Sequence, residues 1–205
     1  QSFTEKEFAE MEQMQLLKRR QKIVGPDLAP HVRFLAVPFV HLKSTIDNLA
    51  EHKKLDGYTV NVIDPEILIK EAKADESNKF RFLLQDLEKT NAALPKGLVT
   101  GLIKEYLSRH IEELTVNSKR KPISVILKNY PQTTDDAMKF ENDIGDILKC
   151  LVYHYDMVNE LPKTDLDRSV TNVVGYFDTV GKNLVIQTKN DEMDRLLKEV
   201  MIEDI

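Results

Sequence analysis

Cysteine is nearly absent from this sequence. Because Cys150 is the one cysteine, an intramolecular disulfide is excluded. Cys150 lies in the apolar run Leu148 to Tyr155, which favours a buried structural thiol. No apolar run approaches the roughly 18 residues of a membrane span, so we expect a soluble, intracellular, cytoplasmic protein without a membrane segment. The chain begins at Gln1 rather than methionine, so a removed targeting segment and a longer parent chain both stay open.

An excess of positive charge is also missing. The chain has 29 basic and 34 acidic residues, which give a formal net charge of −5. Such a chain creates no broad positive field for collecting polyanions, so we predict that it is not a general nucleic-acid binder. The histidines lack the spacing of a zinc or iron site, so no metal ligands are predicted among His31, His41, His52, His110 and His154.

The first residues have the composition of a helical arm. Thr4 to Lys22 is rich in helix-forming residues and free of Gly and Pro, and Val24 to Asp27 ends it. Phe8, Met11 and Leu17 are expected near one face of this helix. The pattern leaves two arrangements open, since the arm could pack on its own domain or dock on a partner.

The rest of the chain alternates short apolar runs with longer helical stretches. The expected strands are Val32–Val37, Tyr58–Ile63, Pro122–Leu127, Leu148–Tyr153 and Leu184–Thr188. The expected helices are Ser44–Lys54, Pro65–Ala74, Lys79–Thr90, Leu98–Leu114, Thr134–Leu148 and Asp191–Met201. Such alternation predicts an α/β fold with a central five-stranded parallel sheet between helical layers. We divide the chain into an arm and linker, residues 1–30, and one domain, residues 31–205.

The turn after the first expected strand has the spacing of a phosphate-binding loop. Residues 37–45 follow the pattern G-x-x-x-x-G-K-[ST], with Lys43, Ser44 and Thr45 at its end. Val37 and Leu42 stand where the two glycines belong. Because glycine allows positive φ and close approach of phosphate to the backbone, these side chains should fill the turn instead of opening it.

Two later segments resemble the adenylate kinase family. Pro95 to Glu105 is similar to that family's P-D-E-L-V-I-G-L-I-K-E, and Val125 to Thr133 is similar to its L-L-D-G-F-P-R-T. Their order and spacing extend the resemblance over residues 31–202. The resemblance implies a three-layer, P-loop-kinase-like fold with Val32–Val37 as the central strand.

The departures from that family fall on residues that handle phosphate. Lys128 stands at the family's Asp, Gln132 at its Arg, and Asp136 at its base-recognising Gln. Ile69 occupies another Arg position. Residues 156–183, where the family has an Arg-bearing lid, contain a single arginine, Arg168. Lysine cannot organise hydrated Mg²⁺, and glutamine supplies no charged fork for phosphate. The resemblance therefore implies a scaffold without phosphoryl transfer.

These observations predict a catalytically inactive adenylate-kinase-like domain that serves as a structural or protein-interaction module. Its expected partners are other proteins in a larger assembly, for which the resemblance suggests the cytoskeleton or a ciliary axoneme. We expect no enzyme activity, no catalytic residues and no cofactor. Lys43, Ser44 and Thr45 are a vestigial nucleotide site with weak or absent binding. The alternative is a divergent nucleoside monophosphate kinase or nucleotide sensor that uses ATP, Mg²⁺, Lys43 and Ser44.

Overall fold

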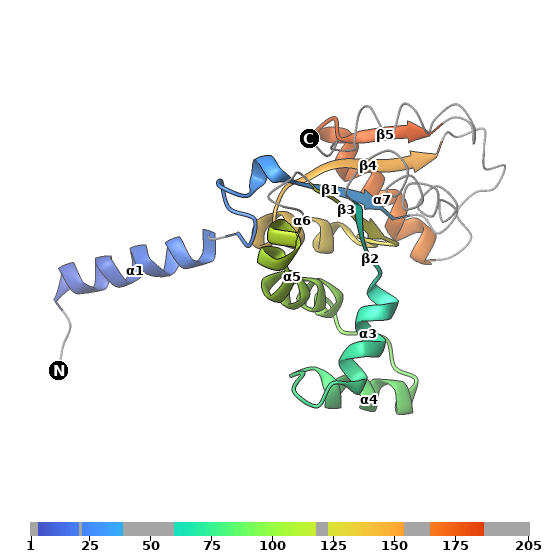
Figure 1. Ribbon diagram of the computed structural model, residues 1–205, viewed down its shortest axis with the longest axis horizontal. Coiled ribbons are helices and arrows are strands. Elements are labelled where there is room, and N and C mark those ends of the chain that lie inside the picture. Colours follow the sequence, from blue (N-terminus) through green and yellow to red (C-terminus); the bar gives the residue numbers. More distant parts are fainter. Residues whose placement is uncertain (1–3, 21, 39–59, 118–122, 154–164, 187–205) are drawn as a thin grey trace.

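A five-stranded parallel sheet forms the centre of the computed structural model, which describes residues 4–20, 22–38, 60–117, 123–153 and 165–186 (Figure 1). Its strands lie in the order β2-β3-β1-β4-β5, and every neighbouring pair is parallel. The strands are β1 (Val32–Val37), β2 (Val60–Ile63), β3 (Ile123–Lys128), β4 (Ile147–Tyr153) and β5 (Asn183–Ile186). The predicted α/β class, the five parallel strands and the central place of Val32–Val37 are confirmed.

Six α-helices accompany this sheet in the described ranges. They are α1 (Glu5–Arg20), α3 (Pro65–Ala74), α4 (Arg81–Thr90), α5 (Leu98–Asn117), α6 (Thr134–Asp143) and α7 (Asp165–Thr179). The predicted bounds of α3 are correct to the residue, because Asp64 caps the helix by accepting a hydrogen bond from the Glu66 N–H and Pro65 occupies its first position. Two predicted helices, 44–54 and 191–201, lie outside the described residues.

One helix prediction had a wrong end, and one helix of the structure was not predicted. The helix predicted to run to Leu148 ends at Asp143, because Gly145 follows and the next strand already begins at Ile147. The helix α7 was not predicted, although Val173 and Phe177 lie four residues apart on its buried side. Its region had been interpreted only as an altered lid.

Both faces of the central strands are buried. Successive side chains of a strand point to opposite faces. On β1, Phe34 and Ala36 belong to the main core, together with residues of α5, α6 and α7. Leu35 and Val37 point to the other face and are equally inaccessible to solvent. This burial on both faces is why the strands appear as continuous apolar runs in the sequence.

The helix α1 extends away from the sheet (Figure 1), and main-chain hydrogen bonds to the domain begin just after it. The Lys22 ammonium lies 2.8 Å from the Asp146 carboxylate. Next along the chain, the N–H groups of Ile23 and Val24 donate to the carbonyl oxygens of Asp143 and Ile144, at 3.3 and 2.8 Å. Val24 is buried in the main core. The base of the arm is thus held at the end of α6.

Candidate functional site

The residues predicted to bind nucleotide lie outside the part of the chain that the structure describes. Lys43, Ser44 and Thr45 lie outside the described residues, as does most of the filled turn predicted for 37–44. Val37, at the start of that turn, is a fully buried strand residue. The structure therefore leaves the prediction for the turn itself untested.

Lys128 forms an ion pair at the carboxyl end of the sheet. Its ammonium lies 3.3 Å from a carboxylate oxygen of Asp64, and their side chains are 20% and 13% exposed. Lys128 is the last residue of β3 and Asp64 follows the neighbouring strand β2, so the parallel sheet brings them to one edge. The positive charge of Lys128 is therefore compensated from within the fold, and Asp64 also caps α3.

The two segments that carry the family resemblance contact each other in the core. The buried Thr100 hydroxyl donates to a carboxylate oxygen of Asp136 at 2.9 Å and also shares a short hydrogen bond with the Tyr130 hydroxyl. Thr133 caps α6 by accepting from the Asp136 N–H at 3.1 Å. Burial raises the pKa of Tyr130 well above its ordinary value. These polar residues tie α5 to α6, so their contacts are structural ones.

A pocket of about 120 Å³ lies between α3 and α5. Its lining residues recur at spacings of three and four on both helices, so each helix turns one face toward the pocket. The lining residues are Leu68, Glu71, Ala72, Asp75, Asn78, Leu102, Glu105, Tyr106, Arg109 and His110. A small apolar cluster closes its floor through Ala72 and Leu102. The pocket is thus apolar below and charged at its rim.

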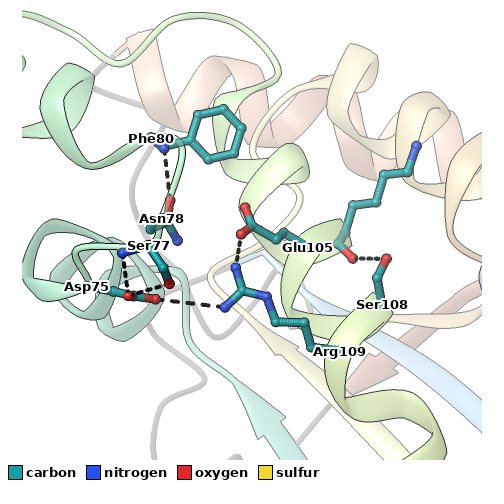
Figure 2. A network of polar contacts seen from close by, with 8 residues as sticks. Asp75, Ser77, Asn78, Phe80, Glu105, Ser108 and Arg109 are labelled. Atoms are coloured by element: carbon teal, nitrogen blue, oxygen red, sulfur yellow. Dashed lines mark hydrogen bonds and ion pairs between the residues drawn. The ribbon is translucent and has the colours of Figure 1, made fainter.

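Arg109 joins the two sides of this pocket. Figure 2 shows its guanidinium pointing between two carboxylates, those of Glu105 on the same helix and Asp75 at the end of α3. The separation between Arg109 and Asp75 is 3.8 Å, while the pair with Glu105 is a direct hydrogen bond. Asp75 in turn accepts hydrogen bonds from the Ser77 hydroxyl at 2.7 Å and the Ser77 N–H at 2.9 Å. The bonds from Ser77 lower the pKa of Asp75, so this carboxylate stays ionised at neutral pH.

The charges of the pocket do not balance. Glu71, Asp75 and Glu105 supply three carboxylates, whereas Arg109 supplies one permanent positive charge. Within the described part of the chain, the buried Oε2 of Glu105 has no hydrogen-bond partner, because Arg109 engages the other oxygen. A buried acceptor without a partner costs about 1–3 kcal/mol, more when it is charged. The residues that line the pocket therefore offer an excess of negative charge to a cationic group.

This pocket was missed in the sequence. In the sequence, Arg109 lies on no motif of the family resemblance, and Glu105 is the last residue of a family-like segment. The available signal was the repeat of polar residues at i, i+3, i+4 and i+7 along 98–117, with Glu105 and Arg109 forming an i,i+4 pair. That signal identifies one helix face, but it does not identify the face of α3 that lies opposite.

Other kinds of site find no support in the described ranges. No three His, Cys, Asp or Glu side chains gather there as a metal site. Burial raises the pKa of the Cys150 thiol to about 12, which removes its thiolate at neutral pH. Among the same residues, no helix has both the length and the apolar character needed to cross a membrane.

Comparison with known proteins settles the family. A family model described as the AIM36 C-terminal domain matches residues 34–186. The chain belongs to the AIM36 family. A relative from Candida albicans (strain SC5314) is 45% identical over the whole chain, which spans 71% of that relative. Relatives from Candida tropicalis and Zygosaccharomyces rouxii are 38% and 28% identical, over 99% and 89% of the chain and 71% and 65% of their own lengths. All three are named "Altered inheritance of mitochondria protein 36, mitochondrial".

Membership of the AIM36 family corrects the earlier assignment to the adenylate kinases. That assignment was wrong, and with it the interpretations as an axonemal adenylate-kinase-like module, a divergent kinase or a nucleotide sensor. The physical reason lies in the two matching segments. Their residues pack and cap helices here, as Thr100, Tyr130 and Thr133 do, and such roles recur wherever a strand turns into a helix.

The expected location was also wrong. The AIM36 relatives are named mitochondrial proteins, which conflicts with a cytoplasmic or ciliary location. The expectation had rested on the absence of a long apolar run, which does not identify a compartment, and on the family resemblance. A thiol as deeply buried as Cys150 is protected in either compartment, so it carries no information about location.

Proposed function

We propose that this AIM36 domain works in mitochondria as a docking domain that receives a basic side chain of a partner protein in the pocket between α3 and α5. The observation that carries the proposal is the excess of carboxylates over cations among the residues that line the pocket. The mitochondrial setting is taken from the names of the relatives.

Charge favours a guanidinium or ammonium group as the occupant. The pocket has three carboxylates and one guanidinium, so a second cation brings it closer to neutrality. A guanidinium also carries several N–H donors in a planar fork, which can meet a carboxylate of the pocket such as that of Glu71. Tyr106 and the apolar floor at Leu102 suit the flat face and the methylene stem of such a side chain.

Size favours a side chain over a free small molecule. Sites for small molecules and cofactors usually measure about 300–1,000 Å³. At about 120 Å³, this pocket holds the end of one long side chain. The rest of the partner would then lie over the exposed rim, where Arg109 and Asp75 are 48% and 38% exposed.

We also propose that this domain has no catalytic activity and binds no cofactor. Two observations support it. Lys128, the cation at the carboxyl edge of the sheet, is already neutralised by Asp64. The Cys150 thiol is buried and protonated. We further propose that the fold follows the P-loop-kinase arrangement, in three layers with β1 at the centre, and retains none of its phosphate chemistry.

Replacing Glu105 with glutamine should weaken the binding of an arginine probe about tenfold. The substitution keeps the shape of the side chain and removes one of the three carboxylate charges of the pocket, and a tenfold loss of affinity corresponds to about 1.4 kcal/mol. The measurement is calorimetric titration of the full chain with N-acetyl-arginine amide at low ionic strength. Such a single-group ligand should bind with a Kd on the order of 1 mM, equivalent to about −4 kcal/mol.

Glu66→Gln is the matched control. It removes the same charge from α3 but lies outside the pocket lining, so its affinity for the probe should equal that of the unaltered chain. Equal weakening by both substitutions would indicate a general charge effect, and no weakening by Glu105→Gln would remove the basis of the proposal.

A further inference from the structure

The carboxylate of Asp75, at the end of α3, is held through one of its two oxygens. Both hydrogen bonds from Ser77 end on Oδ1, the hydroxyl donating at 2.7 Å and the backbone N–H at 2.9 Å. The other oxygen, Oδ2, is turned toward Arg109, and 3.8 Å separates it from Nη1 of the guanidinium (Figure 2). Because a hydrogen bond from nitrogen needs about 2.7–3.2 Å, Oδ2 accepts none from the described part of the chain.

The backbone around Asp75 is fixed as well. Its N–H donates to the carbonyl oxygen of Glu71 at 3.0 Å, and its own carbonyl oxygen accepts from the Asn78 N–H at 3.1 Å. The side chain of Asn78 in turn accepts from the Phe80 N–H at 2.9 Å. Together with the two bonds from Ser77, these contacts hold Oδ2 in place before a ligand arrives. An acceptor that is already ordered costs little entropy on binding.

The other two carboxylates of the pocket are less ready to receive a cation. One oxygen of Glu105 accepts a direct hydrogen bond from Arg109, and the other is buried. Glu71 is exposed, and it lies one helical turn before Asp75, so their Cβ atoms are about 5–6 Å apart. Asp75 is therefore the ordered and accessible carboxylate, and Glu71 is near enough to join it.

We propose that Asp75 anchors the partner's basic side chain through Oδ2, and that Ser77 positions this oxygen by holding Oδ1. The inference rests on the proposed docking function and names the residue that determines its specificity for a cation. A guanidinium that donates to Oδ2 has further donors in its planar fork for Glu71, one turn away. Arg109 is 48% exposed, so it can give up the long contact to Asp75 and keep its hydrogen bond to Glu105.

Asp75→Asn tests the anchor without dismantling the turn. The amide oxygen can still accept both bonds from Ser77, and the NH₂ group then stands where Oδ2 was, so a donor faces the ligand instead of an acceptor. In an NMR titration of the full chain with N-acetyl-arginine amide, affinity should fall at least about thirtyfold. Glu71→Gln is the matched control, since it removes the same charge one turn away, and it should lower affinity only about threefold.

The positioning role of Ser77 has its own test. Ser77→Ala removes the hydroxyl bond to Oδ1 and should lower affinity for the same probe about threefold, while Ser77→Thr keeps a hydroxyl and should restore it. In a chain that already has Asp75→Asn, Ser77→Ala should cause no further loss, because the oxygen that Ser77 positions for the ligand is gone. A purely structural role would instead lower affinity equally in both backgrounds.

The outcomes separate the anchor from the docking function. If the unaltered chain does not bind N-acetyl-arginine amide, both ideas fail. If it binds and Glu105→Gln weakens binding, but Asp75→Asn weakens it no more than Glu71→Gln does, the docking function stands and Asp75 is not the anchor. An equal loss from Ser77→Ala in both backgrounds overturns the positioning role. The ¹⁵N spectrum of each variant, recorded before the ligand is added, verifies that its fold is unchanged.

Discussion

Replacing Phe140 with alanine is expected to lower the free energy of unfolding by about 3–5 kcal/mol. Phe140 on α6 is fully buried and contacts two other rings. Its centroid lies 5.1 Å from that of Phe34 in an edge-to-face arrangement and 5.9 Å from that of Tyr130. The substitution leaves a cavity between β1 and α6 and removes favourable ring contacts. Chemical denaturation of the purified chain measures the change.

Phe82→Ala is the control for this substitution. The same atoms are deleted, but Phe82 on α4 is 72% exposed, so its loss should change the free energy of unfolding by no more than about 0.5 kcal/mol. Equal losses of stability in the two variants would contradict the placement of Phe140 in the core.

Adding one methyl group at Gly145 should destabilise the protein by about 1–3 kcal/mol. A Cβ at this position would lie 2.8 Å from Cε2 of Phe34 and 3.2 Å from Cβ of Val24. Both neighbours are buried, so they have little room to move. Gly145 lies between the end of α6 and β4, where the residues after the arm cross the domain. Gly145→Ala therefore tests how closely the linker packs there.

The same glycine-to-alanine substitution at Gly175 should stabilise the protein. Gly175 lies within α7, it is exposed, and no atom lies within 4 Å of an added Cβ. Alanine in a helix interior is favoured over glycine by about 0.5–1 kcal/mol, so Gly175→Ala should raise the midpoint of thermal unfolding. A stabilised Gly145→Ala variant would contradict the close packing of the linker.

Most of the sheet was predictable because its strands are buried on both faces. Runs such as Val32–Val37 and Ile123–Leu127 contain apolar residues at both odd and even positions, which leaves few alternatives to a central parallel strand. The helix α7 was predictable in principle from the spacing of Val173 and Phe177, but the family resemblance implied an altered lid in this region instead. The end of α6 was misjudged because Gly145 interrupts a sequence that stays apolar into β4.

The family and the candidate pocket were harder to predict, for different reasons. The family assignment relied on short segments whose residues serve common structural needs, so a similar pattern arises in unrelated α/β proteins. The pocket requires two helices to meet. Glu71 and Asp75 are separated from Glu105 and Arg109 by about 30 residues, and only the packing of α3 on α5 through Ala72 and Leu102 brings them together. No local pattern records that contact.

The most direct test of the docking proposal compares arginine with citrulline by NMR. Citrulline replaces the guanidinium with a neutral urea group of nearly the same shape. Titrating the ¹⁵N-labelled chain with N-acetyl-arginine amide should shift backbone signals of α3 and α5 around Glu71, Asp75 and Glu105, while N-acetyl-citrulline amide should shift them at least tenfold less at equal concentration. Equal shifts from both ligands, or arginine-induced shifts centred elsewhere, such as the Lys128–Asp64 edge, would contradict a pocket built for a basic side chain.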